Sequence, residues 1–196
     1  DVLFTGGQIV EVGCWAHARR KFFEAKETDL AHGMEALARI RQLYDVEEEA
    51  KGLATDERAQ LRRMKSRPLL ESFRAWLGQQ YAKVLPKSPL GQAIGYALSN
   101  WEALCRYTEA GEIPIDNNAV ERMLRVVAIG RKNWLFAGSP RGGRTAAILL
   151  SIISSAKRHG LNTWVYLRDV LVRLADLKPG ELDDLLPDRW QDFHAA

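Results

Sequence analysis

Apolar residues recur every three or four positions along most of the chain, the pattern of helices that bury one face. Several of these stretches follow a residue whose side chain can accept a hydrogen bond from the first helical turn, namely Asp29, Ser88, Asp116 and Asn162. Pro68 is placed at the start of a separate segment, because proline disrupts a helix interior. The helices predicted on these grounds run over about 16–25, 29–50, 68–84, 90–108, 117–127 and 144–157, with others opening at Thr55 and after Asn162. We therefore predict a mainly α-helical protein.

One segment follows a different pattern. Residues Gln8–Trp15 place Val10, Val12 and Cys14 on one face at a period of two, which predicts a single β-strand. A strand without partners is not stable. We therefore expect either that the chain dimerises through this strand or that the rest of its sheet lies upstream of Asp1.

The composition is that of an ordinary globular protein. The chain has 196 residues, of which 46% are hydrophobic, and a formal net charge of +3. Cys14 and Cys105 give no disulfide framework, and four scattered histidines give no zinc site. The longest strongly apolar run, Ala146–Ile153, is too short to span a bilayer and is predicted to be a buried helix. With no secretion leader in view, we expect a cytosolic protein that does not contact a membrane.

The charge is distributed unevenly along the chain. Residues 122–168 contain nine basic residues and no acidic one, leaving 19 basic and 25 acidic residues elsewhere, a balance of −6. Such a tract, interleaved with aromatic residues, is typical of binding to a nucleic-acid backbone, although a solvated helix face with chance clustering remains the alternative. From Asp169 onward acidic residues dominate, which predicts a separate tail that packs elsewhere. The candidate DNA-binding residues are Arg122, Arg125, Arg131, Lys132, Arg141 and Arg144.

Glu121 stands at the edge of this tract, on the helix predicted after Asp116. One interpretation is an ion pair with Arg125 one helical turn later. The other is a carboxylate that binds a metal ion, with cations nearby because phosphates must reach the same place. The spacing alone does not separate the two. The opposite side of this helix is predicted to be a buried stripe of Val120, Met123, Leu124 and Val127.

Other side chains also have two interpretations. Trp134 could stack on an unpaired base, but with Leu135 and Phe136 it is better assigned to a core. His17 and Cys14 are interpreted as a polar helix start and a buried thiol, with a metal-ligand role as the alternative. Gly142 and Gly143 are expected to allow close approach of a phosphate before the helix at Arg144 begins.

Six segments carry a resemblance to a known family. They are GCWAHARRKFFEA, RPLLESFRAWL, LPKSPLGQAIGYALSNWEAL, DNNAVERMLRVVAIGRKNWLFAGS, NTWVYLRDVLVRL and LLPDRW. Together and in this order they resemble transposases of the Insertion Sequence 66 family, of the TnpC type, over nearly all of the chain.

The resemblance implies a catalytic domain with a ribonuclease-H-like fold and an Asp, Asp, Glu (DDE) triad, in which the glutamate is Glu121. It places both aspartates upstream of Asp1. Three carboxylates would hold two Mg²⁺ ions, because Mg²⁺ is a hard ion that prefers oxygen ligands. The implied activity is cleavage and transfer of DNA strands, with transposon ends and target DNA as partners. The intact enzyme is expected to be a bacterial, nucleoid-associated homo-oligomer, and this chain by itself is expected to be inactive.

On this reading the chain is the C-terminal portion of a ribonuclease-H-like (α/β) domain, mainly α-helical, with a helical insertion and one strand. Residues 1–25 are the last strand and the following helix, and 26–110 the insertion. Residues 111–168 are the returning core with Glu121 and the basic tract, and 169–196 the acidic tail.

Two alternatives remain at this point. The chain could be a helical DNA-binding protein, since residues 144–177 form a helix, a turn at Gly160 and a second helix capped by Asn162, as in a helix-turn-helix. It could also be a transposase remnant that dimerises with the intact enzyme or regulates it.

Overall fold

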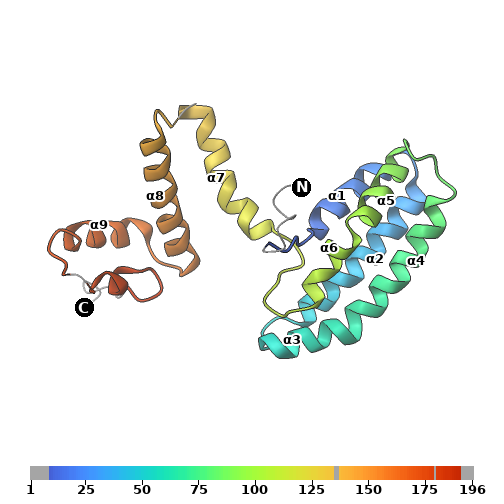
Figure 1. Cartoon of the computed structure of the whole chain (residues 1–196), viewed down its shortest axis with the longest axis horizontal. Helices are drawn as coiled ribbons and strands as arrows, with labels where there is room; N and C mark the ends of the chain where they lie inside the picture. Colours follow the sequence, from blue (N-terminus) through green and yellow to red (C-terminus); the bar gives the residue numbers. More distant parts are fainter. Residues whose placement is uncertain (1–8, 135–136, 179, 191–196) are drawn as a thin grey trace. The chain divides into compact units, whose positions relative to one another are not determined.

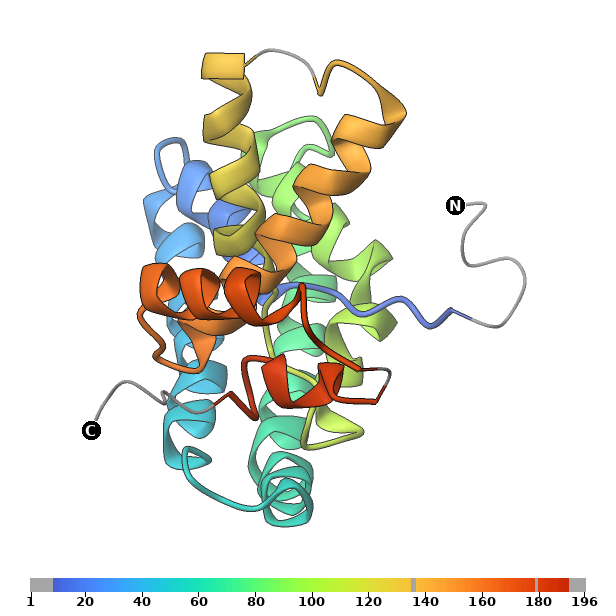
Figure 2. The same cartoon turned by 90° about the vertical axis from the view of Figure 1, so that its left-hand side faces the viewer.

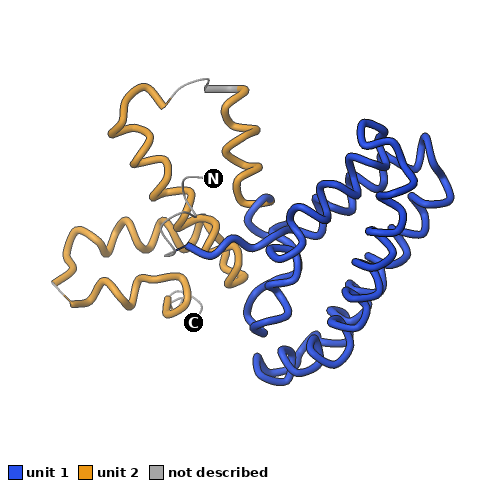
Figure 3. The backbone as a smooth tube through the Cα atoms, turned by 45° about the vertical axis from the view of Figure 1, so that its right-hand side comes forward, with its two compact units in different colours: residues 1–121 blue, residues 122–196 orange. Residues whose placement is uncertain are grey.

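The computed structural model describes residues 9–134, 137–178 and 180–190. The chain divides into two compact units, residues 1–121 and 122–196 (Figure 3). Regular structure in the described ranges is helical, which confirms the prediction of a mainly α-helical protein. The four segments expected from the sequence stay a prediction.

Unit 1 is a bundle of helices (Figure 1). Helix α1 packs against α2 and α5, and α4 packs against α2 and α5. The elements are α1 (Trp15–Ala25), α2 (Leu30–Glu49), α3 (Thr55–Leu61), η2 (Arg62–Ser66), α4 (Arg67–Tyr81), α5 (Pro89–Ser99), α6 (Trp101–Cys105) and η3 (Arg106–Thr108).

Aromatic side chains form the centre of this bundle. Trp15 is fully buried and stacks on Phe73, with 6.0 Å between ring centroids, while Trp101 meets Trp15 edge-on at 5.9 Å. The Trp15 indole N–H donates to the carbonyl oxygen of Leu104 at 2.8 Å. Because a buried indole N–H needs an acceptor, this bond fixes the start of α1 against the end of α6.

The caps predicted from the sequence hold in unit 1. The Asp29 side chain accepts from the N–H of His32, and the Ser88 side chain accepts from the N–H of Gly91. The helix predicted over 90–108 is instead divided, because α5 ends at Ser99 and a new turn begins after Asn100.

The segment from α3 to α4 runs without a loop. Between these helices η2 is a π-helix, a wider turn than an α-helix. Pro68 is the second residue of α4, directly after the π turn of η2, and has no N–H to donate to the helical turn before it. Pro68 does lie at the start of a separate element, α4, as predicted. No loop separates α4 from the helical turns before it.

The strand predicted over Gln8–Trp15 is wrong for the residues that the structure describes. Residues 9–14 are not in a strand, and Trp15 already belongs to α1; Gln8 lies outside the described residues. Val10 and Val12 are exposed. The physical reason is that a strand needs a neighbouring strand for its N–H and C=O groups, and the described ranges contain none.

A buried arginine ties the end of the bundle together. Arg62 is only 1% exposed. It forms a bidentate ion pair with Glu47, in which Nε lies 2.9 Å from Oε1 and Nη2 lies 2.6 Å from Oε2. Its Nη1 lies 2.7–2.8 Å from the carbonyl oxygens of Tyr107, Ala110 and Ile113. The guanidinium therefore fixes the loop that leads to Asp116.

Unit 2 has a small core of its own. Helix α7 (Asn118–Trp134) begins at the end of unit 1 and is followed by α8 (Pro140–Arg158), α9 (Thr163–Arg173) and η4 (Leu182–Leu185). Figure 2 shows the segment with η4 running beside α9. The buried Tyr166 of α9 donates its hydroxyl to the carbonyl of Leu185 at 2.8 Å and meets Trp190 edge-on at 5.5 Å.

The acidic tail is therefore not a separate piece that packs elsewhere. Its described residues pack on α9 through Leu185 and Trp190, and the Trp190 indole donates to Asp169 at 2.8 Å. This hydrogen bond joins Asp169, the first acidic residue of the tail, to Trp190 near the end of the described residues.

Two predictions of buried apolar surface in this part of the chain are wrong. On α7, Val120 and Leu124 are 55% and 60% exposed, and Met123 and Val127 are only half-buried. The run Ala146–Ile153 of α8 is similar, with exposed side chains at Ile148 and Leu149. The periodicity was enough for helices, but burial also requires a packing partner, which the described residues do not supply.

Candidate catalytic carboxylate and nucleic-acid interface

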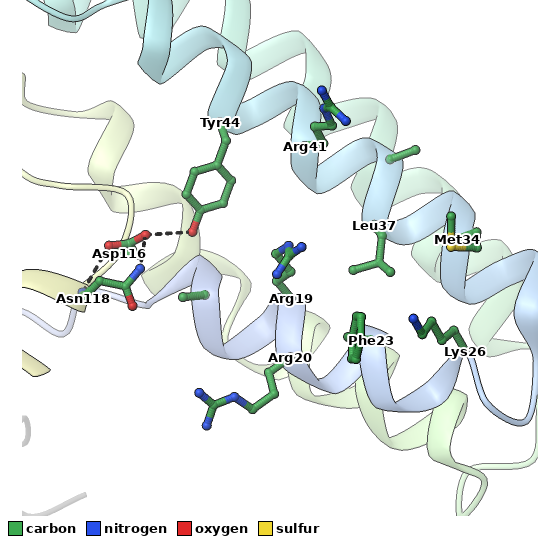
Figure 4. Close-up of a pocket in the computed structure, with 12 residues that line it drawn as sticks. Arg19, Arg20, Phe23, Lys26, Met34, Leu37, Arg41, Tyr44, Asp116 and Asn118 are labelled. Atoms are coloured by element: carbon green, nitrogen blue, oxygen red, sulfur yellow. Dashed lines mark hydrogen bonds between the residues drawn. The ribbon is translucent and has the colours of Figure 1, made fainter. Parts of the chain in front are cut away.

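The start of α7 is fixed by Asp116, as the sequence predicts. Its carboxylate accepts from the backbone N–H of Asn118 at 3.1 Å and from the Asn118 side-chain amide at 2.8 Å. It also accepts from the hydroxyl of Tyr44 on α2 at 2.9 Å (Figure 4). Asp116 therefore caps α7 and at the same time ties it to α2.

Tyr44 acts as a donor in this contact. Burial, together with the hydrogen bond to Asp116, raises the pKa of the Tyr44 hydroxyl well above its usual range. The phenol therefore keeps its proton throughout the neutral range and stays bonded to the carboxylate.

Glu121 lies in the first turn of α7, and its side chain is 41% exposed. Its Oε1 is 3.2 Å from Nε2 of His17 on α1, whose side chain is 43% exposed. Among the described residues Glu121 forms no ion pair with Arg125, the partner that helical spacing offered. The carboxylate therefore faces α1 and is also open to solvent.

The contact with His17 is one that the sequence reasoning missed. The sequence favours a polar helix start for His17, and nothing in the chain between α1 and α7 indicates that these two residues meet. The start of each helix is fixed by its own contacts, Trp15 with Leu104 and Asp116 with Tyr44. The contact between His17 and Glu121 follows from those two anchors.

The described residues do not make a complete metal site. In the ranges that the structure describes, no group of three or more His, Cys, Asp or Glu residues could hold a metal ion. Glu121 offers carboxylate oxygens of the kind that Mg²⁺ prefers, but its neighbour His17 offers nitrogen and Cys14 is a buried thiol. A magnesium site that includes Glu121 needs further oxygen ligands.

All of the candidate DNA-binding residues are exposed. Arg122, Arg125, Arg131 and Lys132 lie on α7, and Arg141 and Arg144 lie in the first turns of α8. Since α7 continues from unit 1 into unit 2, Glu121 and the basic residues share one helix, but the boundary between the units falls directly after Glu121.

The glycines near these residues do not form a loop. Helix α8 begins at Pro140, so Gly142 and Gly143 lie in its first turn, and the N–H of Gly142 donates to the Ser139 side chain at 3.0 Å. A Cβ atom at Gly142 would lie 2.3 Å from the carbonyl oxygen of Ala137. Close packing within the chain therefore explains this glycine. The side chain of Trp134, with Leu135 and Phe136, lies outside the described residues.

A groove of about 930 Å³ lies next to the start of α7, and the sequence reasoning did not find it. It is lined by basic residues of α1 and α2, including Arg19, Arg20 and Arg41, with Asp116 and Asn118 at one end (Figure 4). The ARRKFF segment of α1 supplies Arg19 and Arg20, and in the sequence alone this short basic run is equally compatible with a solvated helix face. Outside residues 122–168 acidic residues outnumber basic ones, so the charge distribution along the sequence does not indicate a basic surface there.

The described part of the chain contains no helix long and apolar enough to cross a membrane.

Comparison with known proteins identifies the class. The profile described as "Transposase IS66 family" matches residues 2–145, and the profile described as "IS66 C-terminal element" matches residues 151–187. The chain therefore belongs to the IS66 transposase family, as its sequence segments indicated.

Among curated relatives the chain is similar to three proteins of Sinorhizobium fredii (strain NBRC 101917 / NGR234), named uncharacterized proteins y4hP, y4jD and y4qI. The identities are 36%, 36% and 38%, over 93%, 91% and 89% of this chain. The matches cover only 36%, 35% and 33% of the relatives, so the chain spans about a third of their length. No solved structure matches the chain.

Proposed function

We propose that this chain is part of the catalytic domain of a DDE transposase, and that Glu121 is one of the carboxylates that bind Mg²⁺ in the parent protein. The observation that carries the proposal is the position of Glu121. Its carboxylate is open to solvent in the first turn of a helix whose start is held by α1 and α2, and exposed arginines follow it on the same helix. A side chain on such a rigid element is suited to hold a ligand in place.

The proposal assigns the other carboxylates to parts of the parent protein outside these residues, on a ribonuclease-H-like sheet. Proteins that move DNA strands commonly use two Mg²⁺ ions held by carboxylates. The positive end of the α7 dipole lies near Glu121, which favours the charged carboxylate there. The exposed apolar side of α7 is consistent with a helix that packs on a sheet outside the described residues.

The DNA partner is proposed from charge. Arg122, Arg125 and Arg131 lie on the same helix as Glu121, and their exposed guanidinium groups are suited to phosphate oxygens. In the intact enzyme we expect transposon ends and target DNA as substrates and a homo-oligomer as the active form.

A second candidate is a helical DNA-binding or regulatory remnant without catalysis. Helix α8 ends at Arg158, Gly160 turns the chain with φ of +73°, and α9 starts at Thr163 with Asn162 as its cap. The Asn162 side chain accepts from the N–H groups of Trp164 and Val165, as the sequence predicts. Two helices joined by such a turn also occur in DNA-binding proteins.

Replacing Glu121 separates the two candidates. In the full-length protein, Glu121→Gln removes the charge and keeps the shape of the side chain. The rate of strand cleavage should then fall by more than about a hundredfold, a larger loss than is usual for a residue that only orients a metal ligand. Retention on DNA at low salt should be unchanged. The matched control is Glu112→Gln, an exposed glutamate just before α7, which should leave cleavage intact. Cleavage within tenfold of wild type in Glu121→Gln would reject Glu121 as a metal ligand.

A further inference from the structure

The groove on unit 1 is built by two helices with basic side chains. Arg19, Arg20 and Lys26 come from α1 or its C-terminal end, and Arg41 comes from α2 (Figure 4). The three arginines are exposed, and Lys26 is half-buried. All of these residues belong to unit 1. None of the basic residues that follow Glu121 lines the groove.

The groove carries a surplus of positive charge. Asp116 is its acidic lining residue, and that carboxylate already accepts from Tyr44 and Asn118. Arg41 has an acidic neighbour in Asp45, but the closest atoms are 3.9 Å apart and both side chains are well exposed, so the pair does little to neutralise the guanidinium. Four cations against one engaged carboxylate leave the groove attractive to an anion.

The shape favours an extended anion over a small one. A pocket for a small phosphorylated ligand would surround it with buried polar groups, whereas these arginines are exposed and lie along the groove. The stretch of α1 from Ala16 to Lys26 is about 15 Å long at the helical rise per residue. Each strand of duplex DNA carries one phosphate per about 3.4 Å of helix axis, so a groove of this length can meet more than one phosphate of a strand.

Apolar side chains also line the groove. Phe23 and Met34 line the groove and are 46% and 51% exposed. Lys26 Nζ lies 3.6 Å from the centre of the Phe23 ring, which holds the ammonium group at the groove. A groove lined by both charged and apolar side chains suits a sugar–phosphate backbone, which offers both phosphate oxygens and deoxyribose carbons.

We propose that the groove between α1 and α2 binds the backbone of duplex DNA through Arg19, Arg20, Lys26 and Arg41. The inference rests on the proposed function, because it names a second contact of the same enzyme with DNA. One end of the groove is lined by Ala16 and Asn118, which belong to the same two helices, α1 and α7, as the contacting pair His17 and Glu121. His17 and Glu121 themselves do not line the groove.

The test is the salt dependence of DNA binding by the 196-residue chain, measured with a random-sequence duplex between 50 and 200 mM salt. Arg19→Gln together with Arg41→Gln removes one cation from each wall. Losing two phosphate contacts should reduce the slope of log affinity against log salt by about 1.8. The drop in affinity across this salt range should then be about twelvefold smaller than in the wild type. Arg19→Lys with Arg41→Lys keeps both charges and should keep the slope.

The matched control is Arg63→Gln together with Arg74→Gln, two exposed arginines of unit 1 outside the groove. It makes the same change in net charge and should leave the slope near the wild-type value. An unchanged slope in the groove variant, or an equal fall in the control, overturns the proposal.

A third pair, Arg131→Ala with Arg144→Ala, separates this proposal from the proposed function. If that pair lowers the slope and the groove pair does not, the groove is rejected and the DNA surface after Glu121 stands. If the wild-type chain shows no salt-dependent affinity for the duplex, the groove and the DNA surface are both rejected, whereas the role of Glu121 is decided by cleavage in the full-length protein.

Discussion

Replacing Arg62 should lower the stability of unit 1 far more than replacing its exposed neighbour Arg63. Arg62 is buried, it pairs through two nitrogens with Glu47, and its third nitrogen contacts three backbone carbonyls. We consider Arg62→Met, which keeps most of the aliphatic stem and removes the guanidinium. The Glu47 carboxylate, 17% exposed, then loses its cation, and the carbonyls lose their donor.

The expected loss follows from these orphaned groups. An unsatisfied buried acceptor costs about 1–3 kcal/mol, and several such costs do not add because the structure relaxes and water enters. Removing one partner of a buried ion pair costs about 3–5 kcal/mol. We therefore expect the free energy of unfolding to fall by about 3–5 kcal/mol, a large fraction of the stability of an ordinary domain.

Urea unfolding followed by circular dichroism measures this loss. The matched control is Arg63→Met, because Arg63 is the next residue in the chain but is exposed, and it should change stability by less than about 0.5 kcal/mol. Glu47→Gln made in the Arg62→Met background should cost less than the same change in the wild type, since the pair is already broken. A loss below about 1 kcal/mol for Arg62→Met would refute the reasoning that the guanidinium is needed to satisfy these groups.

Two further predictions concern single hydrogen bonds. Asp29→Ala removes the cap of α2 and should lower stability by about 1 kcal/mol at pH 7. The N–H of His32 is the main cause that holds the pKa of Asp29 below its usual value, so the stabilisation is present above about pH 4 and is lost as the pH falls further. A difference in urea midpoint that stays constant down to strongly acidic pH would contradict this. Tyr166→Phe leaves the carbonyl of Leu185 without its donor and should destabilise unit 2 by about 1–3 kcal/mol, seen as faster amide exchange in α9; unchanged exchange would show that the bond is not needed.

The parts of the fold that the sequence predicted correctly depend on local chemistry. Asp29, Ser88 and Asn162 each cap a helix by accepting from an N–H two or three residues ahead, so the signal and its partner lie in the same short stretch. The alternation at Val10 and Val12 predicted a strand that the described residues do not form, because a strand also depends on neighbours that a local pattern does not contain.

The candidate site divides in the same way. The family resemblance names Glu121 as the candidate carboxylate, a role that stays a prediction, and Asp116 was predicted from its position before a helix. The contact of Glu121 with His17 depends on how α1 and α7 are anchored, and the groove depends on two helices that bring Arg19 and Arg41 to one surface. Neither contact leaves a periodic signal in the sequence, so both needed the structure.

The π-helix η2 is a place where the length of this segment can change in evolution. A π turn holds more residues than an α turn, so η2 accommodates an extra residue without rotating the helix that follows it. Deleting one residue within η2 would therefore restore a regular α-helix while Leu70, Phe73 and Leu77 keep facing the core that they now fill. The same deletion within α4 would turn the residues that follow by about 100° around the helix. Related chains that share this bundle should therefore differ in length at η2 or in the connections between helices, and not within α4.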